Sequence, residues 1–384
     1  MILPRRHLLA TAGAALSTGL APRRGLAAPS GPQSTAQILA DLAAPYASMP
    51  PLPPVAEEDA LLAMGYVGPT SDGGWTEMHH VALQAVRREF PRLRTVYVES
   101  VPYSADATRL LREFVAEGAQ MVMTGADYGD FLTDVAARAP DTAFVQCDGR
   151  AVKRNVSWYY IAHWYVSYVI GVAAGLLSNT GKLGFIGAFP LPSAYAGANA
   201  ALMGARTVNP DATMQVITIN AWFDPQAAIQ AANALADKGC DFLFGIMDEA
   251  GYLHVAQERG LWAAMWNKDI RQFGPDAYVA SVVLDFAQFY IAQVRARLAG
   301  TWRPVPQLLM MGQGVDRDPW GRRVPQDVRD KADAVRSRIM NGWSPFVGPL
   351  RDQHGTLRLA QGEVMNDLEL YHWNWAVDGV SGLP

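Results

Sequence analysis

Short apolar runs alternate with helical patterns through most of this chain, and this alternation limits the possible folds more than any other feature. Such an order predicts a parallel β-sheet with helices on both of its faces. In the first half the apolar runs are Leu61–Val67, Thr95–Val98, Gln120–Met123, Ala143–Cys147 and Val156–Ile161, and the helical patterns are Met78–Phe90, Ala107–Glu117 and Tyr128–Arg138.

The same alternation occurs a second time, without sequence identity between the two halves. Here the apolar runs are Leu183–Ala188, Met214–Ile219, Phe242–Ile246, Trp262–Trp266 and Tyr278–Val283, and the helical patterns are Ala194–Thr207, Ala227–Asp237 and Ala250–Gln257. We therefore predict an α/β fold of two lobes, each a doubly wound parallel sheet. Ligands of such sheets bind beyond the carboxyl ends of the strands, so we expect a ligand cleft between the lobes.

The boundaries of the two lobes follow from these patterns. We assign residues 58–160 to the first lobe, with a return of the chain to it near residues 267–282. Residues 161–266, together with 283–320, are assigned to the second lobe.

Two further segments lie outside the alternation. Residues 28–57 are rich in Pro, Ala and Ser, which predicts a linker or a loosely docked segment. Residues 321–384 contain an amphipathic helical pattern at Val324–Met340 and a hairpin-like stretch at Leu350–Leu359. We expect this tail to pack across the lobes.

The N-terminus carries the pattern of an export signal. Arg5 and Arg6 precede a short apolar run to Leu20, and small residues follow at positions 27 and 28. This order is typical of a cleaved twin-arginine (Tat-type) signal peptide, here residues 1–27. A basic N-terminal helix of a cytosolic protein is the alternative. No cysteine directly follows the signal, so we expect a periplasmic location without a lipid anchor.

Charge and cysteine content exclude several classes of function. Beyond the four arginines of residues 1–27, 28 basic residues stand against 36 acidic ones. Nucleic acid is therefore not an expected partner, because binding it requires a basic surface. The only two cysteines, Cys147 and Cys240, fit no zinc or redox spacing and are expected to be buried thiols.

One uncharged segment, Trp158–Leu177, imitates a membrane span and contains a G-x-x-x-G pattern. Aromatic residues crowd its first half, whereas a span places them at its two edges. We therefore interpret the segment as a strand that leads into a buried helix.

Two loops combine an aromatic residue with an acid at predicted strand ends. The first, Gly68–Trp75, lacks the lysine and the glycine spacing of a phosphate loop but carries Asp72 and Trp75. The acid would accept hydrogen bonds, and the indole would stack on a flat ring, which suits a neutral heterocycle. The alternatives are that Asp72 caps a helix and that Trp75 belongs to the core.

The second loop, Asn220–Pro225, carries Trp222 and Phe223 followed by Asp224. Asp before Pro is also an ordinary helix start. Further acids follow predicted strands at Asp127, Asp148, Asp248 and Asp269, and each alone is more often a cap or turn residue than a ligand contact.

Motifs of catalysis are missing from the sequence. It contains neither a G-x-S-x-G elbow nor an H-E-x-x-H helix, so we expect neither catalytic residues nor a metal site. His79 and His80 are adjacent and would point apart on a helix, which prevents them from chelating one metal.

From about Leu61 onward, the chain resembles the basic membrane protein (BMP, or PnrA-like) family of solute-binding proteins for ABC transporters. The strings that carry the resemblance are Val67–Trp75, Tyr97–Pro102, Gly187–Pro190, Gly204–Asp211, Asn220–Pro225, Gly300–Trp302 and Pro345–Pro349. The resemblance implies a type I periplasmic-binding fold with three crossovers between its lobes. It also implies a hinged cleft for purine nucleosides or bases.

The resemblance also implies roles for individual residues. The aromatic residue that stacks on the base corresponds to Trp75, with Asp72 as the neighbouring acid. A second aromatic corresponds to Phe223, with Trp222 beside it. An acid that recognises the purine edge corresponds to Asp248 or Asp269.

The chain departs from the family pattern at several positions. Leu284, followed by Asp285, stands where many nucleoside-binding members carry a lysine that contacts the ribose, and Ser193 and Ala196 stand where many carry Glu and Arg. Loss of the lysine favours a free base or another small heterocycle over a nucleoside.

The sequence therefore predicts a non-catalytic binding protein without a cofactor, and we expect a monomer. Its expected partners are a purine-like small molecule and an ABC permease of the inner membrane. A sensory binding protein that signals to a membrane receptor and a periplasmic hydrolase with a carboxylate pair are the alternatives.

Overall fold

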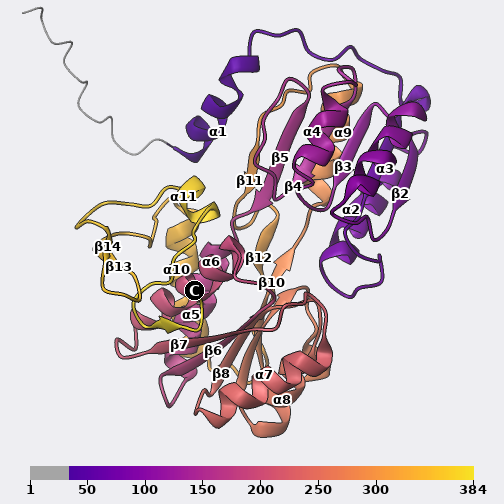
Figure 1. Cartoon of the computed structure of the whole chain (residues 1–384). Coiled ribbons are helices and arrows are strands. Elements are labelled where there is room, and N and C mark those ends of the chain that lie inside the picture. The colour runs from indigo at the N-terminus through magenta and orange to yellow at the C-terminus, as the bar shows by residue number, and fades with distance from the viewer. Residues whose placement is uncertain (1–33) are drawn as a thin grey trace, which may run out of the picture.

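The computed structural model describes residues 34–384 and contains two parallel β-sheets in separate lobes (Figure 1). The predicted signal peptide, residues 1–27, lies outside the described residues. In the first lobe the strand order is β2 (Arg94–Val98), β1 (Leu61–Gly65), β3 (Met121–Thr124), β4 (Ala143–Cys147), β5 (Val156–Ile161) and β11 (Gln307–Leu309), all parallel.

The second sheet is also parallel, apart from one antiparallel pair at its edge. Its order is β15 (Val380–Ser381), β7 (Thr213–Thr218), β6 (Lys182–Gly187), β8 (Phe242–Ile246), β9 (Trp262–Asn267), β10 (Tyr278–Leu284) and β12 (Val315–Arg317), with β12 antiparallel to β10. Strands β1, β3, β4, β5 and β8 are buried along their whole length, as expected for sheets covered on both faces. The predicted fold class, two α/β lobes, is confirmed.

Pairs of helices cover the two sheets. In the first lobe α2 (Trp75–Glu89) packs with α9 (Ala287–Leu298), and α3 (Ala105–Ala116) packs with α4 (Asp130–Ala136). In the second lobe α5 (His163–Leu177) packs with α6 (Pro192–Arg206), and α7 (Pro225–Asp237) packs with α8 (Gly251–Arg259). Single turns of 3₁₀ helix lie at η1 (Ala44–Tyr46), η2 (Glu57–Asp59) and η3 (Arg271–Phe273).

The uncharged segment is a strand followed by a helix, as predicted. Nearly every residue of α5 is buried, and α5 approaches α6 so closely that a Cβ atom at Gly171 or Gly204 would collide with backbone of the other helix. Small residues at this contact permit the close packing. Among residues 34–384, no helix combines the length and the apolar character needed to cross a membrane.

The predicted return to the first lobe near residues 267–282 is wrong. These residues include most of β10, which pairs with β9 in the second sheet. The chain returns to the first lobe after Leu284: α9 packs on α2, and β11 pairs with β5. It then crosses back as β12. The prediction failed because the sequence of a buried apolar strand does not indicate which of two sheets the strand joins.

The tail adds elements to the second lobe and reaches the first. Helix α10 (Gln326–Met340) packs on α5, and β15 extends the sheet beside β7. The hairpin of β13 (Leu350–Arg351) and β14 (Leu357–Leu359) and the short α11 (Asp367–Tyr371) complete it. Tyr371 donates hydrogen bonds to the Asp148 carboxylate (3.1 Å) and the Gly149 carbonyl oxygen (2.9 Å) in the first lobe.

The predicted linker is more structured than expected within its described part. Helix α1 (Thr35–Ala43), capped by Ser34, contacts α11 and buries Leu39 and Ala43. Residues 53–55 then bind the end of α9: Arg297 donates to the Pro53 carbonyl oxygen over 2.7 Å. Helix α1 docks on α11 because Leu39 and Ala43 form an apolar face that is buried there.

Candidate ligand-binding site

A cavity of about 230 Å³ lies between the lobes, beyond the carboxyl ends of strands from both sheets. This is the position where open α/β sheets bind ligands. Its volume is below the 300–1,000 Å³ of common ligand pockets, which favours a small molecule. Aromatic side chains dominate the lining, with three carboxylates among them: Trp75, Tyr103, Tyr160, Trp222, Phe223 and Trp266, and Asp72, Asp148 and Asp248.

Trp75 is the first residue of α2 and forms part of the first-lobe wall. Its indole Nε1 donates a hydrogen bond to the Gly125 carbonyl oxygen over 2.8 Å. Its ring packs edge-on against His79 and Phe286, at centroid distances of 5.0 and 5.8 Å. The sequence left open whether Trp75 contacts a ligand or belongs to the core. In the structure its ring packs on core residues, and the side chain also lines the cavity.

Asp72 caps the N-terminus of α2. Its carboxylate accepts backbone N–H bonds from Gly74 (2.8 Å), Thr76 (2.8 Å) and Glu77 (3.0 Å). The first N–H groups of a helix have no partner within the helix, so a carboxylate there is stabilising. The capping alternative holds for Asp72, although its side chain also lies at the edge of the cavity.

Trp222 and Phe223 lie between β7 and α7 in the second lobe, and Asp224 caps α7 through the Ala227 N–H (2.9 Å). Phe223 is 58% exposed, and Trp222 is 38% exposed with its ring edge-on to Phe189. The structure gives no ring contact for Phe223 within residues 34–384. Large apolar surface of this kind, facing a cavity, is available to a ligand.

Asp248 follows β8 and is only 9% exposed. Burial, with a smaller effect of the Asp72 charge, raises the pKa of Asp248 from 3.8 to about 7. Its Oδ1 accepts hydrogen bonds from Asn267 Nδ2 (2.6 Å) and from the backbone N–H of Trp75 (3.2 Å), which act against this shift. The second bond joins the two lobes.

Asp148 and Tyr160 also line the cavity, and neither was selected from the sequence as a site residue. Asp148 follows β4 with a positive φ of 56°. Its side chain is exposed toward the cavity, while desolvation by the surrounding protein raises the pKa of its carboxyl group to about 6. The only sequence feature that pointed to Asp148 as a site residue was its position directly after a predicted strand. Tyr160 lies inside β5, and its role depends on the pairing of β4 with β5.

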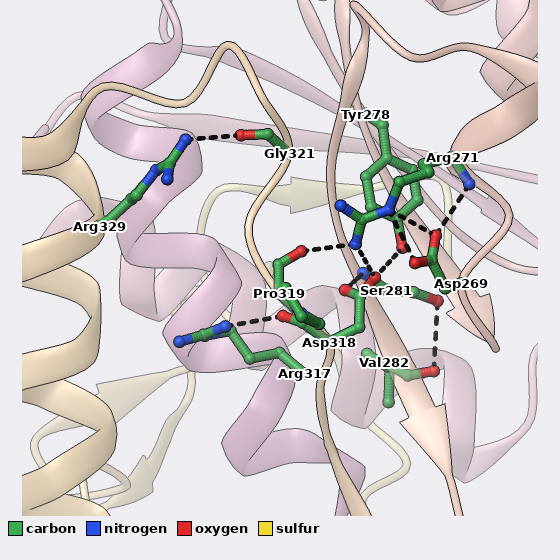
Figure 2. Close-up of polar contacts among 10 residues, drawn as sticks. All are labelled: Asp269, Arg271, Tyr278, Ser281, Val282, Arg317, Asp318, Pro319, Gly321 and Arg329. Atoms are coloured by element: carbon green, nitrogen blue, oxygen red, sulfur yellow. Dashed lines mark hydrogen bonds and ion pairs between the residues drawn. The ribbon is translucent and has the colours of Figure 1, made fainter.

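Of the two acids predicted as alternatives for recognition of the purine edge, Asp248 lines the cavity and Asp269 does not. Figure 2 shows that Asp269 belongs to a polar network beside β10. Arg271 donates from Nε to both Asp269 oxygens (2.8 and 2.7 Å) and from Nη2 to Asp318 (2.8 Å). Asp318, which is buried, also accepts from the Tyr278 hydroxyl (2.6 Å) and the Ser281 N–H (2.7 Å). Asp269 is directed to this network and not to the cavity because the guanidinium of Arg271, two residues further along the chain, binds both of its carboxylate oxygens.

The other predicted departures are placed as follows. Ser193 lines the cavity at the start of α6. Leu284 is buried at the end of β10, and Asp285 accepts the Ala287 N–H at the start of α9. Within residues 34–384, no group of three or more His, Cys, Asp or Glu side chains is arranged to hold a metal ion.

The chain thus folds as two α/β lobes with a largely aromatic cavity between them. A solved structure of an ABC transporter solute-binding protein from Conexibacter woesei has this fold, with a TM-score of 0.61 and 22% identity, covering 74% of this chain and 97% of that one. The family model described as "ABC transporter substrate-binding protein PnrA-like" matches residues 60–312. The chain belongs to this family, and the predicted membership is confirmed.

Two relatives carry names that describe ligands. The purine-binding protein of Brucella abortus is 34% identical over 328 residues, which cover 85% of this chain and 94% of that protein. A protein of Haloferax volcanii, which carries the name of an ABC transporter glucose-binding protein, is 34% identical over 279 residues, covering 72% of this chain and 71% of that protein. Membership implies a small-molecule ligand and a membrane permease as partner.

Proposed function

We propose that this chain is a periplasmic binding protein that captures a free purine base, or a closely similar small heterocycle, for an ABC importer. The observation that carries the proposal is the cavity with Trp75 in one lobe and Phe223 with Trp222 in the other. The name of the Brucella abortus relative supports the purine class. The protein acts as a monomer and catalyses no reaction.

The mechanism follows from the position of the aromatic residues. The heterocycle stacks on Trp75 while the lobes are open, and hinge closure brings Phe223 and Trp222 to its other side. Aromatic stacking contributes about 1–3 kcal/mol per base. The buried carboxylate of Asp248 and the exposed carboxylate of Asp148 accept hydrogen bonds from ring or amino N–H groups of the ligand. Analogues that lack the donor facing Asp248 leave this buried carboxylate unpaired and bind less tightly.

The small volume and the missing lysine favour a base over a nucleoside. A cavity of about 230 Å³ lies below the range of common ligand pockets. Leu284, which the family resemblance matches to the ribose-contacting lysine, is an uncharged and buried side chain. We therefore expect adenine, guanine and hypoxanthine to bind more tightly than the corresponding nucleosides.

A thermal-shift panel tests the proposal. It contains adenine, guanine, hypoxanthine, their nucleosides, uracil, cytosine and D-glucose. A bound ligand at a hundredfold excess over its Kd stabilises the folded state by about 2.7 kcal/mol, which raises the melting temperature. A response to purine bases, followed by calorimetric titration, supports the proposal. A response to D-glucose alone, or to no purine, refutes the purine assignment.

A further inference from the structure

The two lobes are joined by contacts that involve only protein groups. From the first lobe, the loop that ends at Trp75 approaches Asp248 and Asn267 in the second lobe. The Trp75 N–H donates to Asp248 Oδ1 over 3.2 Å, and Lys268 Nζ forms an ion pair with Glu77 Oε2 over 2.5 Å. Both contacts cross the cleft beside the cavity.

Gly74 permits this approach because it has no side chain. A Cβ atom at position 74 would lie 2.5 Å from Asp248 Oδ1, 2.7 Å from Asp248 Cβ and 2.7 Å from Asn267 Nδ2. Each distance is well inside van der Waals contact. The crowded Asp248 Cβ is held by its own backbone, so rotation of the carboxylate alone would not relieve the overlap. Any larger residue at position 74 would force the lobes apart.

Asn267 holds the second-lobe side of this contact. It is 1% exposed, and its Nδ2 donates to the same Asp248 oxygen over 2.6 Å. Its backbone has a φ of 71°, a left-handed conformation that Asn tolerates better than most residues. Asp248 Oδ1 is thus occupied from both lobes, and Oδ2 is left without a hydrogen bond within residues 34–384.

We infer that Gly74, Asp248 and Asn267 form a latch that closes the lobes without ligand and positions Asp248 for the ligand. Gly74 and Asn267 act as positioning residues. They hold Asp248 so that only one carboxylate oxygen remains for a ligand donor. A latch made of protein groups gives the free protein a populated closed state, so less of the binding energy is spent on closure. The inference rests on the hinge closure proposed above but not on the ligand's identity.

Distances between the lobes of the unliganded protein test the latch. Spin labels are attached at Arg112→Cys on α3 and Lys238→Cys after α7, two exposed positions in different lobes. The native Cys147 and Cys240 are buried and would remain unlabelled. In the doubly labelled protein with an intact latch, pulsed dipolar spectroscopy without ligand should give a population with the short distance between labels that is expected for closed lobes. A single open distance in the free protein would overturn the inference.

Substitution of Gly74 provides the second arm. Gly74→Ala should remove the closed population of the free protein and weaken ligand binding about 10- to 100-fold, the range for hydrogen bonds to a charged group. Gly65→Ala is the matched control, since a Cβ there meets only ordinary contacts, the closest 3.5 Å from Thr124 Cγ2. Unchanged distances in Gly74→Ala would refute the latch.

A surface variant keeps the inference testable if Gly74→Ala does not fold. Glu77→Gln removes only the ion pair with Lys268, whose side chains are about one-third exposed. It should lower the closed fraction of the free protein at low salt, because this ion pair crosses the same cleft as the latch. An unchanged closed fraction would mean that contacts between protein groups across this cleft do not hold the lobes closed, which would overturn the inference. Because these distances are measured without ligand, failure of every purine to bind would refute the proposed function and leave the latch intact.

Discussion

The indole Nε1 of Trp75 lies 2.8 Å from the carbonyl oxygen of Gly125 and donates a hydrogen bond to it. Gly125 directly follows β3, so this bond fixes the indole relative to the neighbouring strand end. Edge contacts with His79 and Phe286 support the ring from behind. The ring is thus oriented before any ligand arrives, which reduces the entropy that binding would otherwise cost.

Replacement of Trp75 should separate stacking from orientation. Trp75→Ala removes the stacking surface and should weaken purine binding by about 1–3 kcal/mol, or about 5- to 150-fold. Trp75→Phe keeps a ring but loses the bond to Gly125, so a smaller loss is expected. Calorimetric titration measures both, and circular dichroism checks the fold. Equal affinity of wild type and Trp75→Ala would exclude a stacking role.

Phe223 should contribute to binding but not to folding. Its ring is 58% exposed, so Phe223→Ala removes little buried surface and should change the stability of the free protein by less than about 0.5 kcal/mol. Ligand affinity should fall by about 1–3 kcal/mol. Comparison of melting curves with and without adenine provides the test. A large loss of stability without ligand would assign Phe223 to the core instead.

Asp248 should make stability depend on pH in a defined direction. Its pKa is 3.8 in the unfolded chain and about 7 in the folded protein, so between these values only the folded state keeps the proton. The stabilisation is complete below pH 4 and is lost as the pH rises to 7. The free energy of unfolding should therefore fall by up to about 1.4 kcal/mol per pH unit in this window from this group.

Asp248→Asn provides the control for this pH dependence. The amide oxygen can still accept the bonds from Trp75 and Asn267, but it does not titrate. Relative to wild type, the variant should gain stability as the pH rises from 4 to 7. Urea unfolding at several pH values measures the difference. A constant difference across this window would contradict the raised pKa of Asp248.

The network around Arg271 should affect stability rather than binding. Arg271→Ala leaves the buried Asp318 without its cation, and we expect a loss of about 1–3 kcal/mol. Asp269→Asn weakens a more exposed pair and should cost at most about 1 kcal/mol. Neither variant should change the affinity for purines by more than twofold. A tenfold loss of affinity in Asp269→Asn would return Asp269 to the ligand site.

Local patterns predicted the elements well because burial and periodicity are local properties. The runs Ala143–Cys147, Val156–Ile161 and Phe242–Ile246 match β4, β5 and β8 residue for residue. The order of strands was harder. Tyr278–Leu284 reads as a buried strand in either sheet, and its pairing with β9 depends on packing far from it in sequence.

The candidate site was predictable where one loop carries both position and chemistry. Trp75, at the start of α2, and Phe223, between β7 and α7, each follow a strand and line the cavity. Tyr160 could not be found in this way, because a strand side chain reaches the cavity only through the register of its sheet. Asp269 shows the opposite error: its position after a strand was right, but Arg271 nearby determines its partner.

The burial of helix α5 has a consequence for the unfolded chain. Its fifteen residues carry no charge and are almost all buried against α6, α10 and strands of the second sheet. An unfolded chain would expose this apolar segment to water, where it would associate with other apolar surfaces. Packing of α5 against α6 and α10 therefore removes from solvent the segment of the described chain that would otherwise favour aggregation.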